Sequence, residues 1–137
     1  MTDEQLADIY RSTRTIAVVG ASTNDSKPAH RIPAYLQSQG YRIIPVNPSA
    51  GTIFGLTTVK SLTEITESVD VVDVFRPADE TPEIARQAVA IAASALWLQI
   101  GIESAEAARI ATDGGMTVIM NTCMGATHKR LRSTGAI

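Results

Sequence analysis

Short apolar runs rich in β-branched residues alternate with helical patterns along most of the chain. Five runs have the length and composition of strands, at residues 15–20, 41–46, 69–75, 94–100 and 116–121. Between them, apolar residues recur at helical spacing in two groups, which are Ile84, Ala88, Ile91 and Ala92, and Ala107, Ala108 and Ala111. Strands that alternate with helices predict a parallel sheet covered on both faces. We therefore expect one α/β domain over residues 1–137.

A helix is also expected at the start of the chain, over residues 2–12. Thr2 is a suitable N-cap, and Asp3 and Glu4 would lie in the first turn, where the helix dipole favours negative charge. This polar, acidic segment is unlike the basic and apolar start of a secretory signal peptide.

The connection after the first expected strand has the character of an anion-binding loop. Gly20 stands alone after the run "TIAVV", without the further glycines of a dinucleotide-binding Gly-x-Gly-x-x-Gly turn. Pro28 and Pro33 suit the first turn of a helix, so we expect that helix to begin near residues 29–32. Arg31 would then lie at its positive end. The alternative is a polar surface loop. We favour ligand binding because parallel sheets bind ligands at the carboxyl ends of their strands.

The second expected strand ends in "PVNP", at a place where NAD-binding domains often have an Asp or Glu that binds ribose hydroxyls. Asn47 stands there instead. An amide does not repel a nearby phosphate, so a ligand with a phosphorylated ribose fits better than NAD. The pair Asn47–Pro48 is also a common turn, and that interpretation is preferred when the segment is taken alone.

The third expected strand ends in Phe75, Arg76 and Pro77, just before a helix. Phe75 and Arg76 are suited to flank a purine ring or a phosphate. The alternative is a buried Phe75 and a surface ion pair of Arg76 with Asp79 or Glu80, which contributes little when exposed.

The fourth expected strand ends in a polar residue, Gln99, and Gly101 then lets another chain segment pass close by. Glu103 and Ser104 would begin the next helix. Trp97 is interpreted as a residue of the hydrophobic core, with no role in binding.

Composition narrows the function classes. The 137 residues are 45% hydrophobic and 19% charged, with a net charge of -2, which indicates a globular protein without a basic field for nucleic acid or membranes. The longest apolar stretch, residues 88–102, falls short of the ~20 apolar residues of a membrane helix, so we expect a cytoplasmic protein. The single cysteine, Cys123, excludes an internal disulfide and a cysteine-cluster metal site. Cys123 and His128 lie five residues apart, but an unreactive cysteine is commoner, and we find no metal or catalytic constellation.

Five segments together resemble the small stand-alone CoA-binding proteins, which look like the N-terminal CoA-binding domain of the succinyl-CoA synthetase α subunit. In chain order they are "VVGAS", "GYRIIPVNPSAGTIFG", "VDVVDVFRP", "ALWLQIGI" and "NTCMGATHKRL", within residues 12–131. The resemblance implies a Rossmann-like three-layer α/β/α fold. It also implies a five-stranded parallel sheet of order 3-2-1-4-5, with CoA bound at the carboxyl ends of the strands.

The resemblance also implies which residues bind CoA. Those near the phosphates and the pantetheine arm would be Gly20, Ala21, Ser22, Lys27 and Arg31. Those around the adenosine would be Asn47, Pro48, Phe75, Arg76 and Pro77, and those on the far side would be Gln99, Gly101 and Ile102.

Two departures limit what the resemblance implies. The histidine that the synthetase phosphorylates lies in a second domain without a counterpart in these 137 residues, so acyl-CoA ligation is not implied. Thr122 and Thr127 stand where the family usually has a basic residue and a glutamate, and the basic tail at residues 128–133 is interpreted as a solvated face.

The leading hypothesis is a non-catalytic carrier, sensor or regulatory module that binds CoA or an acyl-CoA. Three alternatives stay open: the CoA-binding half of a split acyl-CoA ligase, a fragment of an NAD(P)-binding oxidoreductase, and a structural partner with a vestigial pocket. A homodimer and a separate partner enzyme also stay open.

Overall fold

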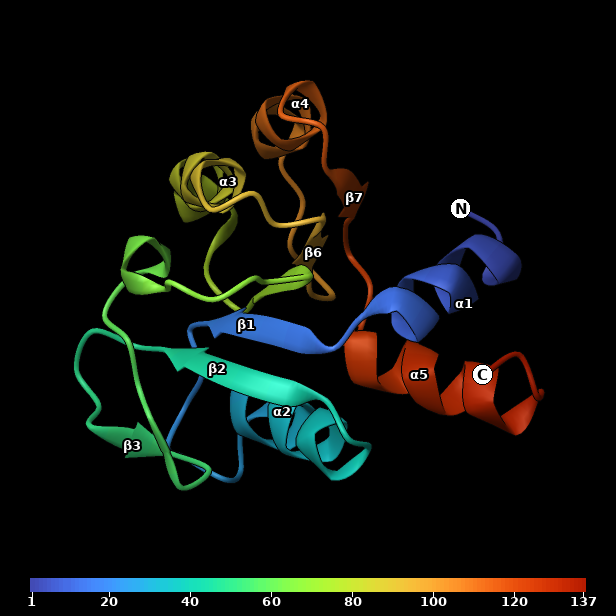
Figure 1. Ribbon diagram of the computed structural model, residues 1–137, viewed down its shortest axis with the longest axis horizontal. Helices are drawn as coiled ribbons and strands as arrows, with labels where there is room; N and C mark the ends of the chain where they lie inside the picture. Colours follow the sequence, from blue (N-terminus) through green and yellow to red (C-terminus); the bar gives the residue numbers. More distant parts are fainter.

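The computed structural model describes residues 1–137, and five parallel strands form its central sheet (Figure 1). The strands are β1 (Thr15–Val19), β2 (Arg42–Val46), β5 (Val71–Val74), β6 (Ala95–Leu98) and β7 (Thr117–Ile119). The helices are α1 (Asp3–Ser12), α2 (Pro28–Ser38), α3 (Thr81–Ala90), α4 (Ala105–Asp113) and α5 (Met124–Ser133). A small antiparallel ribbon, β3 (Thr52–Ile53) and β4 (Leu56–Thr57), and two 3₁₀ turns, Leu62–Glu64 and Ala78–Glu80, complete the fold.

Helices cover both faces of the sheet, as the alternating pattern predicted. Helices α1, α2 and α5 pack on one face and α3 and α4 on the other (Figure 1). Within β1, Ile16 and Val18 belong to the core under α1, α2 and α5, and Ala17 belongs to the core under α3 and α4. Because alternate residues of a strand point to opposite faces, such a sheet needs near-continuous apolar strands. None of the helices has the length and hydropathy that crossing a membrane requires.

The strand order matches the expected 3-2-1-4-5 pattern, with a one-residue bridge in the place of the third strand. The sheet runs β2-β1-β5-β6-β7, because β1 pairs with both β2 and β5. In the order 3-2-1-4-5, the third strand lies at the edge of the sheet, beside the second. Here a single parallel bridge between Val46 of β2 and Val59 occupies that edge. The 3-2-1-4-5 pattern is met when this bridge counts as the third strand, whereas the run at 69–75 forms the central β5. Before this bridge the chain reverses between β3 and β4, at Phe54 and Gly55, which both have positive φ.

Helix α1 confirms the expected start of the chain. Thr2 is its N-cap, and its Oγ1 accepts a hydrogen bond from the Gln5 N–H at 3.1 Å. The Gln5 side chain in turn accepts the Thr2 N–H at 2.8 Å, which completes a capping box.

Helix α2 starts earlier than expected and contains a proline in its interior. It begins at Pro28, so Pro33 lies beyond the first turn. Proline has no N–H, and the carbonyl of Ala29, four residues before it, therefore loses its helical donor. The Ser22 N–H donates to this carbonyl at 3.1 Å. The interior proline is thus accommodated because it leaves a carbonyl free to anchor the loop after β1.

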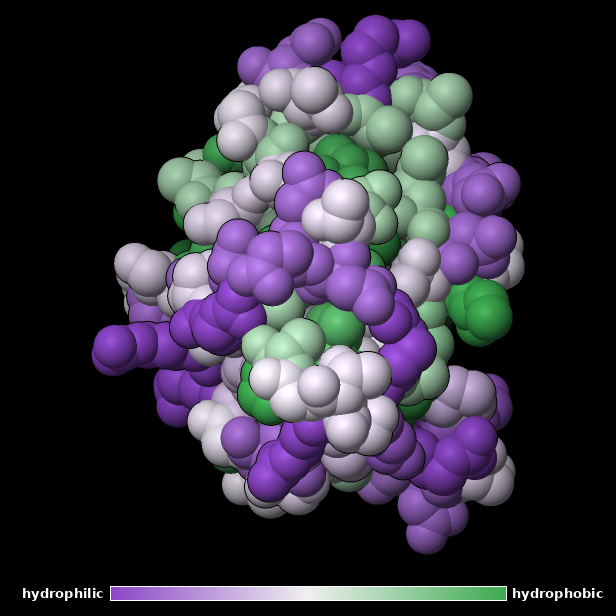
Figure 2. Space-filling model, turned by 90° about the vertical axis from the view of Figure 1, so that its right-hand side faces the viewer, coloured by the Kyte–Doolittle hydropathy of each residue, from purple (hydrophilic) through white to green (hydrophobic).

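The basic tail forms a helix with a buried side, so its interpretation as a solvated face was wrong in part. In α5, Met124, His128 and Leu131 are buried. Arg130 and Arg132 are exposed, and the lower part of the face in Figure 2 is largely hydrophilic. The apolar residues of α5 are few, which is why its periodicity gave no clear signal in the sequence.

Candidate functional site

A cleft of about 690 Å³ opens at the carboxyl ends of β1, β2 and β5. It is lined by residues 19–23, Lys27, Ala29, residues 46–49, residues 60–62, Phe75, Arg76, Glu80, Ile84 and Gln87. These segments lie at the end of the sheet to which the β1 and β2 arrowheads point (Figure 1). Open parallel sheets characteristically bind ligands at this edge, beyond the carboxyl ends of their strands.

Gly20 brings the backbone of the cleft close to Arg76. Its φ is +87°, and a Cβ at this position would lie 2.8 Å from Arg76 Cδ and 3.3 Å from the Phe75 carbonyl oxygen. Both the backbone conformation and the close approach therefore favour glycine. The single glycine of the first loop thus allows the end of β1 to lie close to the end of β5.

The loop after β1 is held by its own hydrogen bonds. The Ser22 carbonyl accepts a hydrogen bond from His30 Nδ1 at 2.7 Å, which requires that this nitrogen carries the proton. The Asn24 N–H donates to Ser22 Oγ at 3.0 Å. The backbone N–H groups of Thr23 and Ala29, both residues of the cleft wall, donate to no group of the protein. The Ala29 N–H lies in the first turn of α2 and the Thr23 N–H lies in the loop before it, and both are donors suited to an anion.

Asn47 fixes the shape of the cleft from the end of β2. Its Nδ2 donates to the Ala21 carbonyl at 2.9 Å, while its Oδ1 accepts the N–H groups of Ser49 and Ala50 at 2.8 and 3.1 Å. The amide thus ties the second strand end to the first loop and also forms the turn that its Asn-Pro sequence suggested.

Charge in the cleft is predominantly positive. Lys27, Lys60 and Arg76 line it, against one acidic residue, Glu80. Arg76 Nε and Nη2 donate to the two Glu80 carboxylate oxygens at 3.0 and 2.7 Å, so the surface ion pair expected for Arg76 forms with Glu80. The hydrogen bonds from Arg76 lower the pKa of Glu80. Lys27 and Lys60 form no ion pair.

The cleft gathers most of the residues predicted for the site. Those that line it are Gly20, Ala21, Ser22, Lys27, Asn47, Pro48, Phe75 and Arg76, and those that do not are Arg31, Pro77, Gln99, Gly101 and Ile102. The Arg31 guanidinium donates to the Ser26 carbonyl instead, within its own loop. Gln99 is buried and donates to Asp73.

Lys60 and Ser61 are wall residues that the sequence analysis missed. They reach the cleft because the bridge between Val46 and Val59 brings the chain back beside β2. Their own segment carries no motif. Only recognition of the β3–β4 turn would have indicated that this part of the chain returns to the site.

Cys123 and His128 have separate structural roles. Cys123 is the N-cap of α5, where its Sγ accepts the Ala126 N–H at 3.4 Å. His128 Nδ1 lies 2.7 Å from the Tyr35 hydroxyl, and burial lowers its pKa. The side chains of His, Cys, Asp and Glu form no group of three or more that is placed to hold a metal ion.

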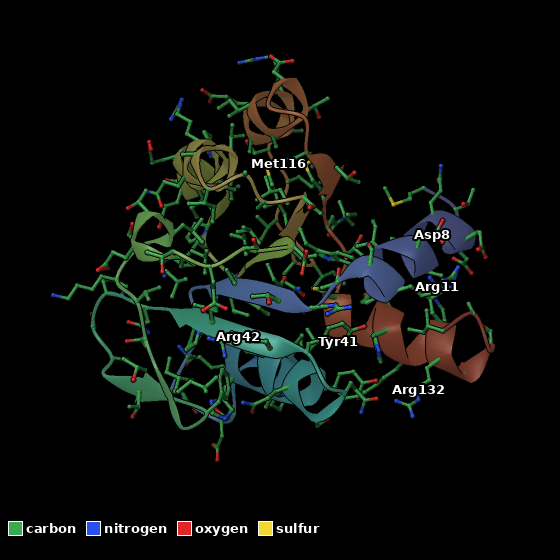
Figure 3. The ribbon with its side chains drawn as sticks, in the orientation of Figure 1. Asp8, Arg11, Tyr41, Arg42, Met116 and Arg132 are labelled. Atoms are coloured by element: carbon green, nitrogen blue, oxygen red, sulfur yellow. The ribbon has the colours of Figure 1, made fainter.

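A smaller hollow of about 270 Å³ lies elsewhere, between α1, α5 and the start of β2. Arg11, Tyr41 and Arg132 belong to its wall and lie on the α1 and α5 side of the molecule (Figure 3). Arg11 already donates to Glu4 and Asp8, at 2.7 and 2.9 Å. This hollow therefore offers an anion less uncompensated positive charge than the cleft does.

Comparisons with known proteins identify relatives along most of the chain. A family described as a CoA binding domain matches residues 14–129. The protein YneT of Bacillus subtilis is 35% identical over 124 residues, which are 90% of this chain and 92% of YneT. An ADP-forming acetate–CoA ligase (II) of Archaeoglobus fulgidus is 34% identical over 85 residues, but these are 61% of this chain and 12% of the ligase. A solved structure from Thermus thermophilus superposes with a TM-score of 0.91 at 39% identity, covering 96% of this chain and 99% of the other, which confirms the Rossmann-like α/β fold.

Proposed function

The chain belongs to the CoA binding domain family, and we propose that it binds coenzyme A or an acyl-CoA in the cleft as a non-catalytic carrier, sensor or regulatory module. The observation that carries this proposal is the cleft itself, with three cationic side chains and one acidic one at the carboxyl ends of the strands. A ligand with several phosphates matches that excess of positive charge.

The parts of CoA have counterparts in the cleft. Lys27, Lys60 and the N–H groups of Thr23 and Ala29 are donors for its phosphates. Phe75 and Pro48 offer apolar surface for the adenine ring. Asn47 supports the site indirectly, because the protein backbone occupies its amide.

NAD(P) is a weaker candidate for the same cleft. The end of β2 carries Asn47 instead of an acid for the ribose hydroxyls, and the first loop has one glycine instead of three. A second candidate function is the CoA-binding part of a ligase assembled from separate chains. The likeness to the Archaeoglobus ligase favours it, although this chain spans 12% of that enzyme's length.

Titration calorimetry with CoA, NAD and NADP on the wild type and on two matched lysine variants tests the proposal. We expect CoA to bind most tightly and Lys60→Gln to weaken it about tenfold, the effect of losing one charge-assisted hydrogen bond. Lys129→Gln, on the exposed side of α5, should leave CoA binding unchanged. Tighter binding of NAD, or equal losses from both variants, would contradict the proposal.

A further inference from the structure

Two buried polar side chains, Asp73 and Gln99, share one hydrogen bond and leave one oxygen each without a partner. Asp73 is fully buried and Gln99 is 3% exposed. Gln99 Nε2 donates to Asp73 Oδ1. The remaining oxygens, Asp73 Oδ2 and Gln99 Oε1, are the only buried side-chain polar atoms in the protein that lack a hydrogen bond. Both unpartnered atoms therefore belong to the same pair.

The surroundings of Asp73 contain no positive charge to balance a carboxylate. Asp73 is the third residue of β5 and lies level with Val18 of β1 and Trp97 of β6. No lysine, arginine or histidine forms an ion pair or hydrogen bond with it.

The titratable groups inside that face gather around Tyr10 of α1. Tyr10 of α1 interacts with Asp73, because burial and then the Asp73 charge raise the pKa of its phenol. The same cluster also contains Cys123 and His128 of the α5 region, together with Tyr35 of α2 and Tyr41. Burial and then the nearby Arg132 lower the pKa of His128, which favours the neutral imidazole.

A buried carboxylate with a single donor is costly, and so is an amide oxygen without a donor. One proton removes both costs, because a protonated Oδ2 is a donor and Gln99 Oε1 is an acceptor. We propose that Asp73 and Gln99 form a buried proton-binding site, in which a proton on Asp73 Oδ2 is donated to Gln99 Oε1 and closes a cyclic acid–amide pair.

Rotation of the Gln99 amide does not remove the need for this proton. If its nitrogen and oxygen exchange places, Oε1 faces Asp73 Oδ1 at the contact that Nε2 now makes, so a proton between these two oxygens is again required. Burial raises the pKa of Asp73 to about 7, although the hydrogen bond from Gln99 lowers it in part. The proton site is independent of any ligand in the cleft.

The proton has a defined effect on stability. The ordinary pKa of Asp73 is 3.8, and the raised folded value is about 7. Between these values the folded state binds more protons than the unfolded state, so the stability of the protein falls as pH rises through this window. Above the folded pKa, this contribution no longer changes with pH.

The first test follows the carboxyl carbons of ¹³C-labelled aspartate by NMR during a pH titration of the wild-type protein. We expect one carboxyl to titrate near neutrality, far above the others, and this titration to be missing from Asp73→Asn. If every aspartate titrates in the ordinary acidic range, the proposal is wrong. This measurement decides the question even if the variant does not fold.

The second test compares thermal unfolding across the same pH range. In the Asp73→Asn variant, the introduced amide can form the same cyclic pair with Gln99 without a titrating proton, so the unfolding midpoint should lack the fall from Asp73 titration. Asp113→Asn, at an exposed position at the end of α4, is the matched control and should keep the wild-type fall. A wild-type fall in Asp73→Asn as well would overturn the proposal.

Discussion

The end of β5 carries two polar pairs with opposite environments. Arg76 and Glu80 form an ion pair in the cleft wall, with side chains 47% and 45% exposed. Three residues before Arg76, Asp73 pairs with Gln99 in the interior. Water can replace either partner of the exposed pair, whereas nothing replaces a partner of the buried pair.

This difference separates positions that fix the fold from positions that can respond to a ligand. The buried pair connects β5 to the segment after β6, so it contributes to the free energy of folding. The exposed pair holds an arginine in a bidentate geometry that a phosphate can also adopt, so its partner is exchangeable.

The largest effect is expected from Gln99→Leu, which leaves Asp73 buried without any partner. We expect a loss of about 2 kcal/mol in the free energy of unfolding, the cost of an unsatisfied buried polar group. Urea denaturation at neutral pH measures it. The double variant Asp73→Leu/Gln99→Leu should recover much of this loss, because two apolar groups in place of both partners leave nothing unsatisfied. A single variant as stable as the wild type would show that the buried pair contributes nothing.

The buried pair also shows where sequence reasoning reached its limit. The α/β alternation and the central apolar strands were predictable, because period and burial are local properties of the sequence. In the sequence, Gln99 is recognisable only as a polar residue at a strand end, which predicts a ligand contact. Asp73 lies within the run at 69–75, which predicts only an apolar strand. Their contact depends on the pairing of β5 with β6, which no local pattern specifies.

The cleft was predictable to the extent that its residues lie directly after strands. Gly20, Asn47 and Arg76 follow β1, β2 and β5, and parallel strands bring such positions to one edge. Lys60 was not predictable in this way, because a one-residue bridge returns its segment to the cleft. Arg31 was placed at the site by its position near a helix start, but its side chain turns back to Ser26.

An intermediate effect is expected from Gly20→Ala, which introduces a side chain next to Arg76 of the exposed pair. A positive φ costs a residue with a Cβ about 1–2 kcal/mol of stability. The new methyl group also meets Arg76 Cδ and the Phe75 carbonyl. Gly40→Ala is the matched control, since its φ is +99° and nothing lies within 4 Å of its Cβ position. Both variants should lower the unfolding midpoint, but only Gly20→Ala should weaken CoA binding. Equal CoA affinities in the two variants would show that the close approach to Arg76 has no role in the cleft.

The smallest effect on stability, with the most specific effect on binding, is expected from Glu80→Gln. Glu80 is the only acid of the cleft and occupies the two guanidinium N–H groups that a phosphate would use. Removal of its charge should leave the unfolding midpoint nearly unchanged, because exposed ion pairs contribute little. It should tighten CoA binding severalfold, because the ligand no longer competes with a carboxylate for Arg76 and is no longer repelled by it. Glu83→Gln, on the same helix region but outside the cleft, removes the same charge and should have a much smaller effect. Calorimetry at low and high salt measures the difference, which screening should reduce. If Glu80→Gln binds CoA no more tightly than Glu83→Gln does, the Arg76–Glu80 pair is not exchanged on binding, and both pairs at the end of β5 serve the fold alone.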